Sequence, residues 1–396
     1  MKPIKAELLS RILAIGTATP SRSISQSDSC LHAQQFFQCD EKGGRTLRML
    51  YKRTEIERRA LVVLDKKDNS IDRTFFSPPQ SKSDRGPSTA ARMARYKSEI
   101  APLALAACRS ALDLAEVEGG EISHLVTASC TGFAAPGFDL ALIKGLPLRP
   151  TTERTHIGFM GCHGALNALR VADAYCRADA KATVLVCTAE LCSVHMQYEW
   201  SAQRLVANSL FSDGAAAVVV RASGVSGLSP VEQPVVSRSS SPSSSSSSSS
   251  SDSPIRWPQY LSSQSVVIDG SSEAMSWEIG DNGFVMTLAA EVPALIETYL
   301  PAFIEKWLAQ SNLRVSDIKS WAVHPGGPRI LQAAQDSLQL DADMLSASRE
   351  ILAEQGNMSS PTVLFILQKL LQQSDKFPCV MLAFGPGLTV EAALIG

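Results

Sequence analysis

The sequence lacks any uninterrupted apolar run of the roughly 20 residues that a membrane-spanning helix requires. Residues 1–15 contain no apolar stretch of the kind found in a signal peptide. Lys and Arg (37) nearly balance Asp and Glu (39), and the formal net charge of -2 gives no basic excess for binding nucleic acid. We therefore expect a cytoplasmic protein with no membrane span and no nucleic-acid partner.

Paired metal-binding cysteines are also missing. The nine cysteines are scattered along the chain, with no CxxC pair and no histidines at the spacing of a zinc site. We expect mostly reduced thiols, as in other cytosolic proteins, and no metal centre. The cysteines then raise the question of which thiol is reactive.

Apolar residues are plentiful, at 45% of 396 residues, so the chain can form a large core. Residues 237–253 are the exception, because all but Arg238, Pro242 and Asp252 are serine. Such a tract buries too little apolar surface to offset the entropy lost on ordering. We predict a disordered insertion that acts as a neutral spacer, with a phosphorylation tract as the alternative. It lies near the start of the second of two predicted domains, 1–223 and 224–396.

An internal repeat relates these two domains. Three pairs of segments, each a short apolar strand or a glycine-led turn before a helix, recur at a nearly constant offset. They are 122–130 and 318–326, 161–164 and 356–359, and 184–186 and 380–382, with offsets 318 − 122 = 196, 357 − 162 = 195 and 380 − 184 = 196. Strands that alternate with helices predict an α/β fold of two similar halves, with mostly parallel sheets. The matched turns, with Cys162, His324 and Asn357, would then meet in one cleft.

Cys162 follows Gly161 and opens a predicted helix of small and apolar residues. A thiol at a helix N-terminus lies at the positive end of the macrodipole, which lowers its pKa and favours the thiolate. Cys162 is therefore a candidate nucleophile. A small buried residue in an Ala- and Gly-rich helix is the alternative, and the local sequence leaves both open.

His324 and Asn357 carry the other candidate groups. His324 ends an apolar strand before a Pro-Gly-Gly-Pro turn, where it can stabilise a thiolate as imidazolium or donate to a thioester oxygen. A histidine of a surface turn is the alternative. Asn357 alone reads as a helix cap ahead of Pro361. The repeat instead places it at the position of Cys162, where its amide can donate to a developing oxyanion.

At these residues the chain resembles the type III polyketide synthase family, which includes chalcone and stilbene synthases. The resemblance extends over nearly the whole chain outside the serine tract. Its four motifs are Gly161-Cys162, the WAVHPGGP of 321–328, the GNMSS of 356–360 and the GPGLTVE of 385–391. It implies a thiolase-like, five-layer αβαβα fold with two pseudo-duplicated halves, usually in a homodimer.

The resemblance also implies the reaction. Cys162 would accept a starter acyl group from its coenzyme A thioester, while His324 and Asn357 stabilise the thioester carbonyl of malonyl-CoA as it loses carbon dioxide. The resulting enolate would attack the acyl group on Cys162 in a Claisen condensation, and after further rounds the chain would cyclise. Coenzyme A thioesters are the substrates, and neither a cofactor nor a carrier protein is expected.

Further site residues are implied by position in the family. Phe211 and Phe284 correspond to two gatekeeper phenylalanines between the cavity and the coenzyme A tunnel, with ordinary core residues as the alternative. Cys192 and His195 stand where plant chalcone synthases have cavity threonines. The remaining substrate-binding candidates are Thr131, Ser359 and Arg53. Arg53 lies near a basic position that contacts coenzyme A phosphates, and His163, beside the nucleophile, is interpreted as structural.

The departures at Cys192, His195 and Ala135 indicate the microbial branch of the family. They favour a fatty acyl starter and an alkylpyrone or alkylresorcinol product, with a chalcone- or tetrahydroxynaphthalene-type product as the alternative. Two other functions stay open: a single condensation on acyl carrier protein, as in ketoacyl synthase III, and a non-catalytic acyl-CoA-binding relative. Phe211 and the closing glycine-rich motif favour the polyketide synthase, and the complete Cys162, His324 and Asn357 set argues against the binding protein.

Overall fold

The computed structural model describes residues 8–68, 70–223 and 258–396, and the predicted serine-rich insertion at 237–253 lies outside them. One sheet of nine strands runs through the described residues in the order β11-β12-β13-β8-β1-β7-β6-β4-β5. The strands are β1 (Leu9–Ala18), β4 (His124–Ser129), β5 (Glu153–Gly158), β6 (Thr183–Leu191), β7 (Asp213–Ser223), β8 (Gln259–Val267), β11 (Ser320–Val323), β12 (Cys379–Gly385) and β13 (Thr389–Ile395).

The strand order repeats between the two halves. The first half runs β4-β6-β7-β1 and the second β11-β12-β13-β8, each with one parallel pair followed by antiparallel pairs. The halves join where Ser10 of β1 pairs with Tyr260 of β8. The repeat seen in the sequence is thus a repeat of topology. The expectation of mostly parallel sheets is wrong, because connections as short as the one between Gly385 and Thr389 permit only antiparallel pairing.

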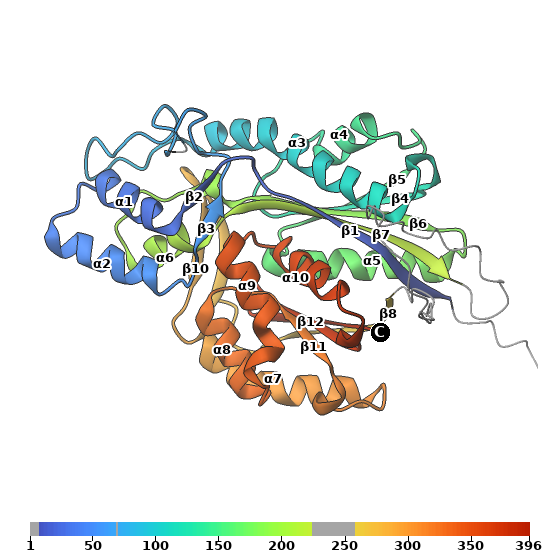
Figure 1. Ribbon diagram of the computed structural model, residues 1–396. Coiled ribbons are helices and arrows are strands. Elements are labelled where there is room, and N and C mark those ends of the chain that lie inside the picture. Colours follow the sequence, from blue (N-terminus) through green and yellow to red (C-terminus); the bar gives the residue numbers. More distant parts are fainter. Residues whose placement is uncertain (1–7, 69, 224–257) are drawn as a thin grey trace, which may run out of the picture.

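Helices form three layers around the two halves of the sheet (Figure 1). α5 and α10 lie in the central layer, α3 and α4 cover the outer face of the first half, and α7 and α8 cover the second. The helices are α1 (Gln26–Phe36), α2 (Glu41–Lys52), α3 (Thr89–Ala115), α4 (Phe138–Gly145), α5 (Gly164–Ala178), α6 (Ala202–Leu210), α7 (Val292–Ala309), α8 (Pro328–Ser337), α9 (Ser346–Gln355) and α10 (Thr362–Leu371). The expected thiolase-like αβαβα arrangement is confirmed.

The alternation of side chains along the strands explains this layering. In β6, Val184 and Val186 face the central core, whereas Leu185 and Cys187 face the core beneath α3. All nine residues of β6 are buried, and most of them are apolar, as expected of a strand covered on both faces. In the part of the chain that the structure describes, no helix is long and apolar enough to cross a membrane.

Candidate active site

Cys162 lies in a single 3-10 turn, Gly161–His163, that leads into α5. Gly161 has a φ of 63°, and a Cβ at this position would lie 2.5 Å from Cδ of Pro386. Only glycine therefore lets the closing Gly-Pro-Gly turn pack on the cysteine turn. Of the nine free cysteines, seven are buried, and only Cys39 and Cys162 are partly exposed.

Cys162 opens onto a small chamber of about 40 Å3. The chamber walls include four other residues predicted from the sequence: Thr131, Cys192, Phe211 and Ser359. These residues come from both halves of the chain. His324 and Asn357, which the repeat predicts in the same cleft, are not among the residues that line the chamber. Ser359 itself has a φ of 60°, and its Oγ lies 3.6 Å from Sγ of Cys130, a second thiol in the chamber.

Burial dominates the ionisation of Cys162. It raises the pKa of the thiol to about 12, a hydrogen bond with Ser359 opposes this shift, and the Glu190 carboxylate reinforces it. The prediction that the helix start lowers this pKa is wrong for the free protein, because loss of hydration outweighs the helix end. The resting form of Cys162 is a neutral thiol.

His324 follows β11, where its backbone N donates to O of Leu382 at 2.8 Å. Its imidazole is 1% exposed, and neither Nδ1 nor Nε2 has a hydrogen-bond partner among the described residues. Burial, with the nearby His163 as the second cause, lowers the pKa of His324 to about 3. His324 is therefore a buried, neutral imidazole and not a surface-turn residue.

Asn357 is 1% exposed, and its backbone pairs with the segment around Phe211. Its N donates to O of Leu210 at 3.0 Å, and its O accepts from N of Ser212 at 2.8 Å. The side-chain Oδ1 accepts from N of Ser359 at 2.8 Å, while Nδ2 donates to no described residue. Because α10 begins at Thr362 and is capped by Pro361, the helix-cap interpretation of Asn357 is wrong.

Glu190 is a site residue that the sequence reasoning missed. Its buried carboxylate accepts from Cys130 N at 3.0 Å, from Thr131 Oγ1 at 2.6 Å and from Ser360 Oγ at 2.7 Å. Desolvation raises the pKa of Glu190, and these hydrogen bonds oppose the shift. One carboxylate within the nine buried residues of β6 was the available signal. Glu190 ties the chamber turns of the two halves together.

A larger cavity of about 370 Å3 adjoins the chamber. Cys192, Phe211, Trp277 and Met286 line both spaces, so they form the boundary between them. Trp277 and Met286 belong to a hairpin of β9 (Met275–Gly280) and β10 (Gly283–Leu288), and the sequence reasoning did not identify them. Phe284, predicted as a gatekeeper, lines only the larger cavity.

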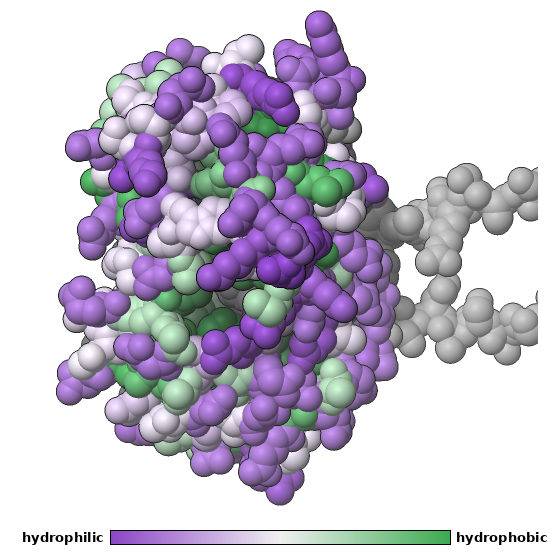
Figure 2. Space-filling view, turned by 90° about the vertical axis from the view of Figure 1, so that its left-hand side faces the viewer, coloured by the Kyte–Doolittle hydropathy of each residue, from purple (hydrophilic) through white to green (hydrophobic). Residues whose placement is uncertain are grey.

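The lining of the large cavity is mainly apolar and aromatic. It includes Phe36 of α1, Phe37 just after that helix, Phe76, and Leu205 of α6. Figure 2 shows the face of the molecule that carries α1 and α2, where hydrophilic residues predominate and hydrophobic residues are visible in a hollow near the centre. Such a lining suits an apolar chain better than a charged one.

His195 supports the wall between these spaces. Its ring stacks on Phe284, with centroids 4.3 Å apart and an interplanar angle of 16°. Nδ1 accepts from N of Phe284 at 2.9 Å, and Nε2 donates to O of Thr131 at 2.7 Å. Burial lowers the pKa of His195 to about 3, so the ring is neutral. Trp277 Nε1 donates to O of Cys130 at 2.8 Å and fixes the opposite edge.

Arg53 caps the C-terminus of α2, is exposed and lines neither space. Arg59 is instead buried against the large cavity and donates to O of Phe211 at 2.8 Å. Its Nε also donates to Oε1 of Gln26 at 3.0 Å. Arg59 thus fixes the backbone of Phe211, a contact that a local basic cluster in the sequence does not disclose. No group of three or more His, Cys, Asp or Glu among residues 8–68, 70–223 and 258–396 could hold a metal ion.

Comparison with known proteins shows the family of the chain. Residues 2–224 match the N-terminal domain of chalcone and stilbene synthases, and residues 259–396 match the C-terminal domain. The chain is 32% identical to the alpha-pyrone synthesis polyketide synthase-like Pks18 of Mycobacterium tuberculosis, over 100% of this chain and 93% of that protein. It is also 32% identical to 1,3,6,8-tetrahydroxynaphthalene synthase of Streptomyces peucetius, over 74% of this chain and 72% of that protein.

Solved structures show the same fold. PKS-I from the brown alga Ectocarpus siliculosus superposes with a TM-score of 0.83 and 26% identity, over 99% of both chains. The C-terminal type III polyketide synthase domain of Steely1 from Dictyostelium gives a TM-score of 0.82 and 25% identity, over 98% of this chain and 99% of that one. The chain belongs to the chalcone and stilbene synthase family and is a type III polyketide synthase, an acyltransferase by reaction class.

Proposed function

We propose that Cys162 is the acyl-carrying nucleophile of this synthase and that His324 and Asn357 act on the thioester carbonyls. The partly exposed thiol at the chamber wall supports the first role. The unpartnered imidazole of His324 and the free Nδ2 of Asn357 support the second. Buried polar groups without partners are rare in native proteins, so the two ring nitrogens of His324 await a substrate oxygen or a proton.

The thiol of Cys162 and the imidazole of His324 are both neutral before substrate binds, so proton transfer between them must accompany the attack on the thioester. As Sγ of Cys162 attacks the starter thioester, His324 accepts the thiol proton and later returns it to the departing coenzyme A sulfur. For extension, His324 Nε2 and Asn357 Nδ2 donate to the malonyl thioester oxygen while the carboxylate leaves as carbon dioxide. The enolate then attacks the acyl group on Cys162, and the freed Sγ accepts the extended chain.

A fatty acyl starter and an alkylpyrone or alkylresorcinol product fit this site best. The observation that carries this proposal is the apolar cavity of about 370 Å3 that shares Phe211, Trp277 and Met286 with the Cys162 chamber. An alkyl chain that fills it would gain about 0.8 kcal/mol for each buried methylene. The name of the mycobacterial relative, an alpha-pyrone synthesis protein, points to the same product class.

Mass spectrometry of the products tests this proposal. Malonyl-CoA is incubated with acyl-CoA starters from acetyl to stearoyl and with an aromatic starter, using wild type and Cys162→Ala. Fatty acyl starters should give pyrones or resorcinols, and these should vanish in the variant. Products from aromatic starters alone, or a naphthalene product from malonyl-CoA alone, would contradict the fatty acyl assignment. A requirement for acyl carrier protein would contradict the use of free thioesters.

We further propose a homodimer that acts in the cytoplasm. Free thiols at all nine cysteines fit a reducing compartment. Three apolar side chains near the chamber turns are exposed, with Phe133 68%, Phe159 51% and Met160 42% accessible. Exposed apolar clusters of this kind favour association. Light scattering should give twice the mass of 42.5 kDa, and a value near 42.5 kDa would exclude the dimer.

A further inference from the structure

The N-terminal end of α3 contacts three separate segments that line the large cavity. The helix is capped by Ser88, whose Oγ accepts from N of Ala91 at 3.3 Å. Thr89, Arg92 and Arg95 then follow at intervals of three residues, about one per turn. Each of these three side chains holds a different wall of the cavity.

Thr89 and Arg92 hold the two walls nearest the chamber. Oγ1 of Thr89 donates to O of Gly280 and accepts from N of Gly283 at 2.8 Å, which fixes the turn between β9 and β10. Arg92 is fully buried, and its NH1 donates to O of Val194 and of Met196, each at 2.8 Å. These bonds fix the turn that carries His195.

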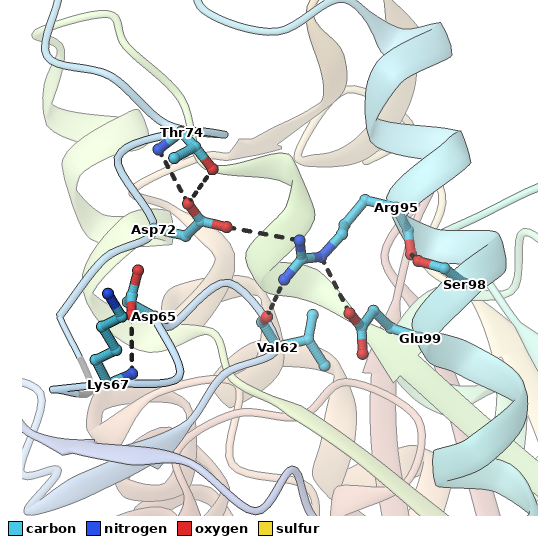
Figure 3. A network of polar contacts seen from close by, with 8 residues as sticks. All are labelled: Val62, Asp65, Lys67, Asp72, Thr74, Arg95, Ser98 and Glu99. Carbon is cyan, nitrogen blue, oxygen red and sulfur yellow. Dashed lines mark hydrogen bonds and ion pairs between the residues drawn. The ribbon is translucent and has the colours of Figure 1, made fainter.

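Arg95 holds the third wall, the segment 62–76, as Figure 3 shows. Its NH2 donates to O of Val62 at 2.8 Å, and its NH1 lies 3.6 Å from Oδ2 of Asp72. Its Nε lies 3.2 Å from Oε1 of Glu99, one turn further along α3. The N of Val62 donates to Oδ2 of Asp213 at 2.7 Å, so the segment is held from both sides.

Contacts between arginine guanidinium groups and phenylalanine rings complete the attachment of this segment. The Arg95 guanidinium carbon lies 5.8 Å from the ring centroid of Phe75, and that of Arg92 lies 5.1 Å from Phe76. Both distances are in the range of cation–π attraction. Val63, Ile71 and Phe76 from this segment line the large cavity. Because residues 65–68 and 70–87 form no helix and no strand of the sheets, the wall depends on these contacts for its position.

Replacing Arg95 should disturb the structure less than replacing Arg92. The Arg92 side chain lies in the core, whereas 23% of the Arg95 side chain is exposed. In the segment that Arg95 holds, residues 65–68 and 70–75 are at least partly exposed, and both ends, 62–64 and Phe76, are buried. Removing Arg95 would therefore loosen one wall without opening a void beneath α3. The cavity would widen at Ile71 and Phe76 while Cys162, His324 and Asn357 keep their positions.

We propose that Arg95 is a positioning residue that sets which acyl starters the enzyme accepts, by holding the segment 62–76 against the large cavity. This inference rests on the proposed function, in which that cavity takes the apolar chain of an acyl-CoA starter. The expected consequence of its loss is a shift toward longer or bulkier starters, with the condensation chemistry unchanged.

Steady-state kinetics of Arg95→Leu tests the inference. Leucine keeps apolar bulk but removes the bond to Val62 and the ion pairs with Asp72 and Glu99. The ratio of kcat/KM for a long acyl-CoA to that for a short one should rise about tenfold, mainly through KM, the size expected for one or two methylenes in an apolar pocket. Arg109→Leu is the matched control, since Arg109 is exposed on the same helix and donates to O of Gly145 at 3.1 Å, away from the cavity. Its ratio should stay within about twofold of wild type.

A folded Arg95→Leu enzyme with an unchanged ratio, or with equal losses for every starter, overturns the inference. If that variant does not fold, Asp72→Asn replaces it, because it removes one ion pair and should shift the ratio in the same direction by about threefold. Arg95→Lys keeps a cation but not the planar fork, and should restore part of the wild-type ratio. Failure of the proposed function would appear separately, as a wild-type enzyme that uses no fatty acyl starter.

Discussion

The two halves of the molecule share one strand order but carry different reactive groups. Cys162 matches Asn357 at an offset of 195, so the thiol belongs to the first half and the amide to the second. The position that matches His324, 324 − 196 = 128, is Ala128, and the one that matches Glu190, 190 + 196 = 386, is Pro386. The two halves thus share the same turns at matched positions, but the side chains on those turns differ, and so do the reactions that they can perform.

The candidate groups of the two halves also differ in their exposure to solvent. Cys162 is partly exposed to the chamber, whereas His324 and Asn357 are 1% exposed. In the proposed mechanism, the first half therefore offers the group that meets the acyl chain, and the second offers groups that act from within the protein. If this division is right, variants of the two halves should fail in different ways.

Among variants of the second half, replacing His324 by alanine should have the largest effect. It removes the buried imidazole that we assign as proton acceptor and as donor to the thioester oxygen. The rate of malonyl-CoA decarboxylation and of product formation should fall about 10⁴-fold, the upper range for general acid–base groups. His124→Ala in β4 of the first half is the control, because His124 stacks on Tyr175 away from the chamber. Loss of less than tenfold in His324→Ala would break the assignment.

The pH dependence of the reactivity of Cys162 tests whether its thiol and the imidazole of His324 are both neutral before substrate binds. With a thiol pKa near 12, the thiolate fraction rises tenfold for each pH unit across pH 6–9, and His324, with a pKa near 3, stays neutral throughout. Alkylation of Cys162 by iodoacetamide, followed by mass spectrometry of its peptide, should therefore accelerate about 10³-fold over this range. A free small thiol of pKa about 8.5 should level off near pH 9. A plateau for Cys162 between pH 6 and 8 would instead reveal a resting ion pair.

Asn357→Ala should cost about 10²-fold in product formation, as expected for the loss of one oxyanion donor. The effect should be smaller than that of His324→Ala, because the imidazole would still donate to the thioester oxygen. Acyl transfer from the starter to Cys162, measured as single-turnover coenzyme A release, should fall less than decarboxylation. Equal losses in both steps would show that Asn357 serves the fold of the chamber and not the enolate.

Much of the fold could be predicted from the sequence, since the repeat offset alone indicated two halves with the same strand order. That Cys162, His324 and Asn357 meet in one cleft stays a prediction. The features that the sequence did not predict correctly depend on three-dimensional packing. The raised pKa of Cys162 follows from burial, which a helix-start pattern does not report. Trp277 and Met286 reach the chamber from a hairpin whose register no local motif reveals. Glu190 was hidden because its bonding partners lie 59 to 170 residues away in the chain.

Glu190→Gln should give the smallest effect and addresses the contact between the halves. Through its carboxylate, β6 of the first half bonds to Ser360 of the second and to the turn at Cys130 and Thr131. An amide offers one accepting oxygen in place of two, and its NH2 would face existing donors. The free energy of unfolding should fall by about 2 kcal/mol, as for other buried groups left without partners. Urea titration followed by circular dichroism measures this change.

The exposed Glu297 of α7 provides the control for that variant, and Glu297→Gln should shift the unfolding free energy by less than about 0.5 kcal/mol. A double-mutant cycle with Ser360→Ala isolates the contact across the halves and should give a coupling of about 1 kcal/mol. Purely additive effects would mean that Glu190 supports only its own half. The facing turns would then be held together by the packing of α5 against α10, and not by this carboxylate.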